Sequence, residues 1–278
     1  MGPPRTARRS FFLSEIRINR LNERSGGEAK MDIRDEVFSR TYGIYGPDVA
    51  KLFDAHVAVV GLGGVGGALA LSLARASIGH LTLIDGDIVA PSNLNRQAIS
   101  SRSVIGKKKA DVCAALVADI NPEIEVRAIS DFICAENMAD FLEGVDYVAD
   151  CIDDVRAKLD LIEYCTKHKI AIISSMGAGN KRNPCGFRVS DISRTQMDPL
   201  ARVIRQRLRK RGITHLQVVY SEEAPIHAYA PDWEEASQND DPSITGKYTK
   251  RNPPASSPFV PSAAGLLMGS AIVEDLTH

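Results

Sequence analysis

A glycine-rich turn constrains this chain more than any other feature of its sequence. The string Gly61-Leu62-Gly63-Gly64-Val65-Gly66-Gly67 follows an apolar run at 56–60 and opens a segment rich in Ala and Leu. An apolar run of that length predicts a strand, and the segment after it predicts a helix. Between a strand and a helix, glycines let backbone N–H groups approach a phosphate at the helix N-terminus. The string therefore predicts a nucleotide-binding turn in which Gly61, Gly63, Gly64 and Gly66 contact the nucleotide.

The alternation of strand and helix patterns continues for about a hundred residues after this turn. Helices are expected at 64–77, 107–119, 135–142 and 155–169, and strands at 56–60, 81–84, 124–129, 147–149 and 170–174. Such alternation predicts an α/β fold: a Rossmann-like, doubly wound, mostly parallel sheet covered on both faces. Beyond Gly177 the sequence indicates short strands near 187–189 and 216–220, a charged helix between them, and an apolar helix from Phe259. This part predicts a smaller, more antiparallel C-terminal half.

The domain organisation follows from these changes in pattern. Residues 31–278 are expected to form one domain, with one half at about 34–175 that contains the glycine-rich turn and a second half at about 176–278. Residues 231–258 are rich in Asp, Asn, Ser, Pro and Lys, which predicts a mobile loop. Residues 1–30 are expected to be a disordered extension, and their Arg-rich start leaves an organellar transit peptide as the alternative.

Composition excludes several classes of protein. The 34 Lys and Arg residues balance 35 Asp and Glu, so an RNA or membrane partner would have to be met by a local patch. The five cysteines are at least fourteen positions apart and form no CxxC pair, so we expect no zinc and a reducing, cytoplasmic location. No run approaches the roughly 18 apolar residues of a spanning helix, so no membrane association is expected.

An acid at the end of the second strand completes a nucleotide pattern. Asp85 lies nineteen positions after Gly66, where a carboxylate usually binds the ribose hydroxyls. The glycines and this acid specify a nucleotide without specifying which one. On these features alone, a nicotinamide or flavin cofactor is favoured.

Two cations after that acid change the preference to a triphosphate. Arg96 lies in Ser92-Asn93-Leu94-Asn95-Arg96-Gln97, and Lys109 lies thirteen positions later at the start of a predicted helix. A dinucleotide dehydrogenase has no evident use for them. Arg96 offers a planar fork of donors and Lys109 a point charge, and both would neutralise charge that builds on a leaving pyrophosphate.

A third element is the acidic stretch Asp150-Cys151-Ile152-Asp153-Asp154, which follows a predicted strand. Ligands of open α/β sheets bind at the carboxyl ends of the strands, so Asp153 is a candidate Mg²⁺ ligand beside substrate phosphates. The alternative is structural: Asp153 or Asp154 caps the helix that follows. Because the sequence also contains Arg96 and Lys109, which suit a triphosphate, metal binding by Asp153 is favoured.

In this order and spacing, GxGGxG, DxD, SNLNRQ, GxxKA and DCxDD resemble the adenylation domain shared by ubiquitin-activating enzymes and sulfur-carrier adenylyltransferases. The resemblance covers about 34–175 and implies that ATP, with Mg²⁺ on Asp153, is bound by a homodimer. It also implies that an arginine, here Arg40, is delivered across the dimer interface. Its implied nucleotide site comprises Gly63, Gly64, Asp85, Asp87, Asn93, Arg96, Gln97, Lys109, Asp153 and Asp154.

The rest of the chain resembles one branch, the tRNA threonylcarbamoyladenosine dehydratases. The segments that carry this likeness are 177–179, 188–192, 198–201, 205–209, 220–222 and 259–265. The implied reaction is adenylation of the carboxylate of a threonylcarbamoyl-modified adenosine beside the tRNA anticodon, followed by ring closure within that group and release of AMP. Proximity would supply much of the acceleration, so no protein thiol is required. Some relatives carry a cysteine where Val218 stands, and some use sulfur-transfer partner proteins.

One helix predicts a surface for RNA. Asp198 can cap it with Pro199 at its first position, and six cations follow without an acid. Leu200, Ile204 and Leu208 would face the core, leaving the cations free to follow phosphates. The alternative is an ordinary solvated face. The residues predicted to bind tRNA are Arg202, Arg205, Arg209, Lys210 and Arg211.

Three other functions stay open from sequence. The main one is an adenylyltransferase that activates the C-terminus of a ubiquitin-like sulfur carrier, although that branch commonly has the CxxC pairs this chain lacks. The second is a non-catalytic nucleotide-sensing or scaffold module, for which Arg96 and Lys109 would be dispensable. The third is an NAD-dependent dehydrogenase.

Overall fold

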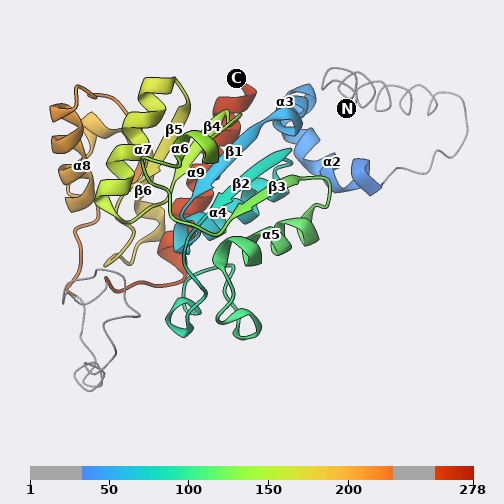
Figure 1. Ribbon diagram of the computed structural model, residues 1–278, viewed down its shortest axis with the longest axis horizontal. Helices are drawn as coiled ribbons and strands as arrows, with labels where there is room; N and C mark the ends of the chain where they lie inside the picture. The colour runs from blue at the N-terminus through green and yellow to red at the C-terminus, as the bar shows by residue number, and fades with distance from the viewer. Residues whose placement is uncertain (1–32, 228–253) are drawn as a thin grey trace, which may run out of the picture.

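The computed structural model describes residues 33–227 and 254–278, which are built around one seven-stranded sheet (Figure 1). Its strand order is β3-β2-β1-β4-β5-β7-β6. All neighbouring strands pair in parallel except β6 and β7. The strands are β1 (His56–Val60), β2 (His80–Ile84), β3 (Glu125–Ile129), β4 (Tyr147–Asp150), β5 (Ala171–Ser175), β6 (Phe187–Asp191) and β7 (Gln217–Ser221).

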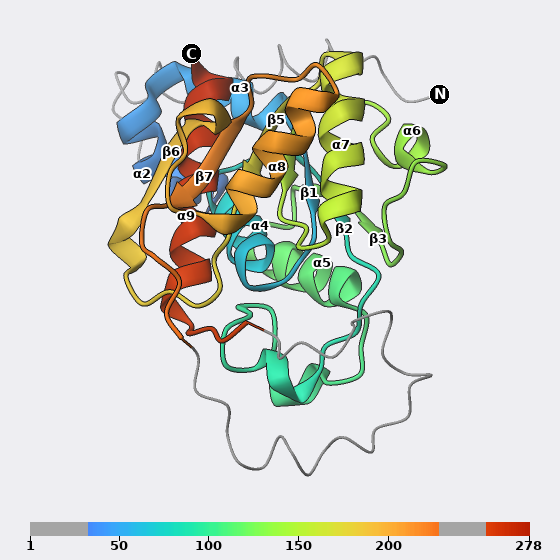
Figure 2. The same cartoon turned by 90° about the vertical axis from the view of Figure 1, so that its left-hand side faces the viewer.

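Helices cover both faces of the sheet (Figure 2). Side chains from α4, α5 and α9 pack on one face and those from α6, α7 and α8 on the other. The helices are α2 (Ile33–Tyr45), α3 (Val49–Asp54), α4 (Gly64–Arg75), α5 (Lys109–Ile120), α6 (Met138–Phe141), α7 (Val155–His168), α8 (Pro199–Lys210) and α9 (Phe259–Thr277). The prediction of a doubly wound, mostly parallel α/β fold is confirmed.

The one antiparallel pair among the described strands lies in the C-terminal half, as the sequence predicts. Strand β7 pairs with β5 in parallel, and only β6, at the edge of the sheet, runs against its neighbour. Helix α8 provides the crossover that a parallel pair requires. The described part of the second half therefore extends the nucleotide-binding sheet.

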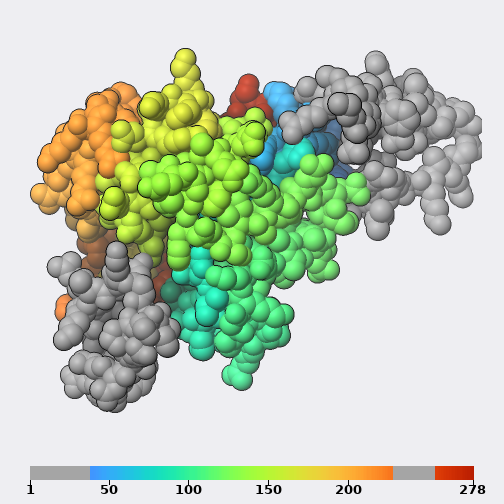
Figure 3. All heavy atoms as spheres, in the orientation of Figure 1, coloured from blue at the N-terminus to red at the C-terminus, as the bar shows by residue number. Residues whose placement is uncertain are grey.

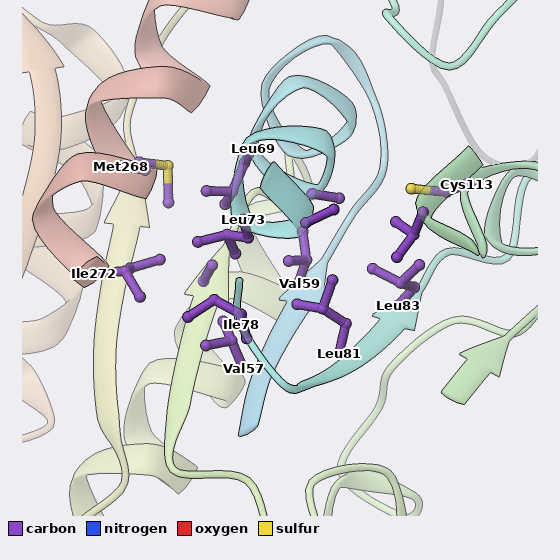
Figure 4. Packing of buried hydrophobic residues seen from close by; sticks show 14 of the residues in the cluster. Val57, Val59, Leu69, Leu73, Ile78, Leu81, Leu83, Cys113, Met268 and Ile272 are labelled. Atoms are coloured by element: carbon purple, nitrogen blue, oxygen red, sulfur yellow. The ribbon is translucent and has the colours of Figure 1, made fainter. Parts of the chain in front are cut away.

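The main core lies between the sheet and helices α4, α5 and α9 (Figure 4). Leu69 and Leu73 of α4 are fully buried there with Met268 and Ile272 of α9. The strands contribute β-branched and leucine side chains, as expected for a parallel sheet that is covered on both faces. The fully buried strand residues of this core include Val57, Val59, Leu81 and Leu83.

Helix α9 packs so closely against α4 that two of its glycines leave no room for a side chain. A Cβ added at Gly265 would overlap the carbonyl oxygen of Val65, and one at Gly269 would lie 2.7 Å from Ser72 Oγ. By length and composition α9 could span a membrane, and it is the one described helix of which this is true. Because Val260, Ala264, Met268 and Ile272 are fully buried, α9 is a core helix of this fold.

Two expectations fall outside the described residues, wholly or in part. The extension predicted at 1–30, with its transit-peptide alternative, lies wholly outside them. Of the loop predicted at 231–258, only residues 254–258 are described. Asn180 anchors both sides of the gap, because its carbonyl accepts from Ile226 N at 2.8 Å and its Oδ1 accepts from Ala255 N at 2.8 Å.

Candidate functional site

The glycine turn lies at the carboxyl ends of β1 and β4. Gly61 has φ +89°, in the left-handed region, and a Cβ there would lie 2.8 Å from Cys151 O. A Cβ on Gly66 would overlap the carbonyl oxygen of Gly61. Both positions therefore require glycine, one for its backbone conformation and both for the close approach of other backbone atoms. The turn is held open at the start of α4, where helix N–H groups can receive an anion.

Replacing Gly66 by alanine tests this geometry. The added methyl group has no room, so the turn must shift away from the start of α4. We expect Gly66→Ala to lose the thermal stabilisation that the wild type gains from Mg-ATP and to melt at a lower temperature without it. Gly43→Ala is the control: Gly43 also lies in a helix without positive φ, but a Cβ there meets nothing within 4 Å, so it adds the methyl group without the clash. Equal ATP stabilisation of both variants would contradict this account.

Asp85 fixes the glycine turn to the end of β2. Its Oδ2 accepts from Leu62 N at 2.6 Å, and its Oδ1 accepts from Asp87 N at 2.9 Å. The side chain is buried, so its charge acts at short range in a poorly solvated place. The acid predicted to bind ribose therefore also joins the glycine turn to the segment that follows β2.

Lys109, the first residue of α5, reaches the same place. Its Nζ lies 2.8 Å from Asp87 Oδ2 and 4.0 Å from Asp85 Oδ2, and its side chain is 7% exposed. Its backbone N–H donates to Asp87 O at 3.0 Å, which fixes the start of the helix. Among the sequence-predicted residues, the structure thus brings Lys109, Asp85 and Asp87 together beside the glycine turn.

The segment with Asn93, Arg96 and Gln97 borders the turn from the other side. Asn93 is buried and its Oδ1 accepts from Ala90 N at 3.0 Å, which shapes the segment itself. Gln97 Nε2 and the carbonyl oxygen of Arg96 face the glycines, at 3.9 Å and 3.4 Å from Cβ positions built on Gly63 and Gly64. The half-buried guanidinium of Arg96 donates to Ser92 O at 2.8 Å and Asn95 Oδ1 at 2.9 Å. The backbone of Arg96 therefore lies at the site, while its guanidinium is hydrogen-bonded within its own segment.

The two acids that follow β4 have different roles. Asp154 is the N-cap of α7, because its Oδ1 accepts from Ala157 N at 2.8 Å. Asp153 is exposed one residue earlier, next to the glycine turn through the contact of Cys151 with Gly61. In the described part of the chain, no three His, Cys, Asp or Glu side chains gather as a metal cage. A single carboxylate fits Mg²⁺ that is held mainly by phosphate oxygens and water.

Behind these acids lies a fully buried ion pair that the sequence did not reveal. Lys158 Nζ is 2.7 Å from Asp150 Oδ2 and also donates to Ser174 Oγ at 3.1 Å and Ser175 O at 3.0 Å. Both charged side chains are 0% exposed. The pair ties the carboxyl ends of β4 and β5 to the first turns of α7. It therefore holds the backbone that carries Asp153.

An aromatic side chain at the edge of the site was also missed. Phe132 follows β3 and is 63% exposed, yet its ring lies so close to Gly86 that a Cβ there would be 2.5 Å from it. Gly86 separates Asp85 from Asp87. An exposed ring beside the acid predicted to bind ribose is in a position to stack on a base. No periodicity marked this residue, because it lies in an irregular segment.

A second buried ion pair supports the loop after β5. Lys181 Nζ lies 3.0 Å from Asp198 Oδ2 and donates to Ser221 O at 3.0 Å, with both side chains almost fully buried. Asp198 caps α8 by accepting from Ala201 N, as predicted. A Cβ on Gly177 would lie 3.1 Å from Asp198 Oδ2. The start of α8 is thereby packed against the loop at the carboxyl end of β5.

The cations predicted to meet RNA divide into two groups. Arg202, Arg209 and Lys210 are exposed. Arg205 instead donates to Thr195 O at 2.8 Å and Ile192 O at 3.3 Å, which closes the turn before α8. Arg211 pairs with Asp160 at 2.8 Å and Glu163 at 2.6 Å, and these contacts raise its pKa. These two side chains have protein partners that the spacing alone did not indicate.

Arg40 is exposed on α2, far from the glycine turn along the strands. Phe38 of this helix packs edge-to-face on Phe53 of α3, and α3 leads into the first residue of β1. Helices α2 and α3 lie at the opposite end of the strands from the segment with Arg96 (Figure 1). A contact between Arg40 and the nucleotide would have to come from a second copy.

The thiol nearest the site is held in its protonated form. Cys151 Sγ lies 3.9 Å from Met268 Sδ, and burial, with a smaller effect of Asp150, raises the pKa of this thiol far above neutrality. Burial also raises the pKa of Cys113 to about 12. The exposed thiols are Cys134 and Cys185. Val218, where some relatives carry a cysteine, is fully buried in β7.

Comparison with known proteins gives one consistent result. Residues 38–213 match the ThiF family. The chain is 43% identical to the tRNA threonylcarbamoyladenosine dehydratase of Bacillus subtilis over 242 residues, which cover 86% of this chain and 94% of that protein. It is 35% identical to the molybdopterin-synthase adenylyltransferase of Salmonella typhimurium over 139 residues, which cover 50% of this chain and 55% of that protein.

Solved structures give the same answer. The chain resembles the Escherichia coli tRNA N6-threonylcarbamoyladenosine dehydratase TcdA in complex with ATP, with a TM-score of 0.76 and 32% identity. This match covers 89% of this chain and 96% of that one. The same protein in complex with AMP matches with a TM-score of 0.76 over 90% and 97% of the two chains.

Proposed function

The chain belongs to the ThiF family, in the branch of the tRNA threonylcarbamoyladenosine dehydratases, and we propose that it dehydrates threonylcarbamoyladenosine in tRNA at the expense of ATP. The carboxylate of the modified adenosine attacks the α-phosphate of ATP and displaces pyrophosphate. The acyl adenylate is then attacked within the same group, which closes the ring and releases AMP. One carboxylate oxygen leaves with AMP, so the nucleoside loses one water.

The observation that carries this proposal is the position of Lys109. It places a buried ammonium 4.0 Å from Asp85, the acid expected to bind ribose, at the edge of a turn that has no room for a side chain at Gly61 or Gly66. A cation there can neutralise charge that develops on phosphate oxygens as pyrophosphate leaves, and its low exposure strengthens that effect. The guanidinium of Arg96 would bind the phosphates as well, once its hydrogen bonds to Ser92 O and Asn95 Oδ1 are broken. ATP in complex with the related TcdA supports a triphosphate at this turn.

Asp153 would hold Mg²⁺, together with the phosphates. The ion would polarise a phosphoryl oxygen when bound. The chain's own contribution is to keep Asp153 exposed beside the turn while Asp154 caps α7 and Lys158 secures the strand ends. No protein thiol is needed, in keeping with the raised pKa of Cys151.

The wider setting follows from the same reaction. The substrate half supplies contacts to tRNA from α8, with Arg202, Arg209 and Lys210 as the exposed cations. A homodimer would bring Arg40 of a second copy to the phosphates. The reaction includes no sulfur step, so turnover does not require a sulfur-transfer partner. We infer a cytoplasmic location from the tRNA substrate and the lack of CxxC pairs, with import into an organelle as the alternative.

The test is incubation with Mg-ATP and tRNA from cells that lack this activity, followed by mass spectrometry of the modified nucleoside. We expect the nucleoside to lose one water, with one AMP and one pyrophosphate formed per conversion. ATP-dependent release of ADP, or an unchanged nucleoside, would contradict the proposal. A reaction without ATP is the control. The carboxylate is not activated there, so the nucleoside should keep its mass.

A sulfur-carrier adenylyltransferase is the other adenylating function in this family. Its expected substrate is a small protein that ends in Gly-Gly. Exchange of pyrophosphate into ATP that depends on such a protein, and not on modified tRNA, would favour it over the dehydratase. The likeness to that branch covers only half of this chain, whereas the dehydratase of Bacillus subtilis is matched over 86% of it.

A further inference from the structure

Helices α7 and α8 lie side by side (Figure 2), and their atoms form neighbouring parts of the surface (Figure 3), where residues of both helices line a groove. The groove has a volume of about 300 Å³ and is lined by Arg156 and Leu159 of α7 and by Arg207, Lys210 and Arg211 at the end of α8. We call it the α7–α8 groove. Four of its five residues are cationic, in a protein whose net charge is −1.

We propose that the α7–α8 groove binds the phosphate backbone of the tRNA substrate beside the modified nucleotide. This inference rests on the proposed function and names the surface that receives its RNA. It adds Arg156 and Arg207 to the expected contacts and removes Arg205, whose guanidinium is occupied by Thr195 and Ile192.

The charge of the groove is only partly balanced by the protein. Arg211 is neutralised by Asp160 and Glu163, and Arg156 has a loose contact with Asp160 at 4.0 Å. Arg207 and Lys210 form no ion pair within residues 33–227 and 254–278. Two cations are therefore unbalanced, and a third, Arg156, is 90% exposed. An anion that enters the groove gains their charge without first displacing a strong partner.

The groove suits a nucleic-acid backbone. Guanidinium groups bind phosphate in a planar, bidentate way, and arginines contribute from both helices. The lining of the groove is almost entirely apolar: Leu159 and the hydrocarbon stems of the cationic side chains form it, and a ribose or base can pack against them. The charged ends of the exposed Arg156, Arg207 and Lys210 are available to phosphates at its rim. The volume is at the small end of the range for ligand sites, which suits a phosphate and its sugar.

On α7, the groove begins close in sequence to the candidate active site. Arg156 lies three residues after Asp153, in the first turn of α7. The other helix begins at Asp198, which contacts both Lys181 and the loop at Gly177. Both helices thus start at the carboxyl ends of the strands, where the modified base must be activated, and the groove lies between the first turns of α7 and the end of α8. The nucleotides beside that base must pass over the adjacent surface, and this one is cationic.

The test compares a groove variant, Arg207→Gln with Lys210→Gln, with a matched control, Arg75→Gln with Lys167→Gln. Each pair removes two exposed cations, and the control pair lies on α4 and at the end of α7. We expect the groove variant to raise the KM for modified tRNA about tenfold and to reduce the salt dependence of binding by about one unit of slope per lost contact. Its kcat at saturating tRNA and its stabilisation by Mg-ATP should match the wild type.

Arg156→Gln provides a second test on the other helix, at a side chain that is 90% exposed and whose loss should not affect folding. It should raise the KM for tRNA in the same direction. If both variants keep the KM and salt slope of the control, the proposal is overturned, and the groove would have to serve another anion, such as an acidic protein. If the wild type itself converts no tRNA, the proposed function fails first. The two failures are therefore distinguishable.

Discussion

Lys109→Ala should reduce ATP-dependent turnover by about 10²–10³-fold, the usual cost of removing one preorganised group from a developing charge. Its ammonium is buried beside Asp85 and Asp87, so no solvent cation can replace it at the same place. The effect should fall mainly on kcat, because the charge on the leaving pyrophosphate develops in the transition state. Single-turnover formation of AMP from ATP and modified tRNA measures it.

The control for this variant is Lys107→Ala. Lys107 belongs to the same run of three lysines but is exposed, and alanine there should leave turnover within about twofold of the wild type, as for a surface change away from the site. Circular dichroism separates loss of chemistry from loss of fold. A folded Lys109→Ala variant with turnover equal to that of Lys107→Ala would refute the assignment.

Lys158→Ala should lower the free energy of unfolding by about 3–5 kcal/mol, the range for removing one partner of a buried ion pair. The loss would leave Asp150 charged at 0% exposure, with Ser174 and the backbone N–H of Ile152 as its remaining hydrogen-bond donors among the described residues. Urea denaturation measures the change, through a lower midpoint at an unchanged slope.

Two further variants identify the cause. Lys167→Ala, at an exposed position of the same helix, should change the free energy of unfolding by no more than about 0.5 kcal/mol. Combining Lys158→Met with Asp150→Asn removes both charges and should recover much of the loss. If Lys158→Ala alone were as stable as Lys167→Ala, the buried pair would not hold the strand ends as described.

The sequence predicted the order of elements because their signals are local. Glycines at a strand-to-helix turn, strand-length apolar runs and caps such as Asp198 report on a few neighbouring residues. Lys109 could be placed near Asp85 for the same reason: the carboxyl ends of parallel strands share one edge of the sheet.

What escaped prediction depends on contacts between distant segments. Lys158 lies in a helix with several charged residues, so the sequence alone predicts a solvated side chain. Its partners Asp150 and Ser174 come from two different strands. In the sequence, Arg205 is one of several cations on a helix predicted to face solvent. The structure shows that its guanidinium instead donates to the carbonyl oxygens of Ile192 and Thr195. The α7–α8 groove needs Arg156 beside residues that lie fifty positions further on, which no local pattern can indicate.

The account depends on activation of a carboxylate by AMP, and an isotope label tests that step directly. Threonylcarbamoyl-modified tRNA would be labelled with a heavy oxygen isotope in its carboxylate and incubated with enzyme and Mg-ATP. Adenylation predicts that one labelled oxygen appears in the phosphate of AMP for each ring closed. Label in inorganic phosphate with ADP as the product, or unlabelled AMP beside closed rings, would contradict it.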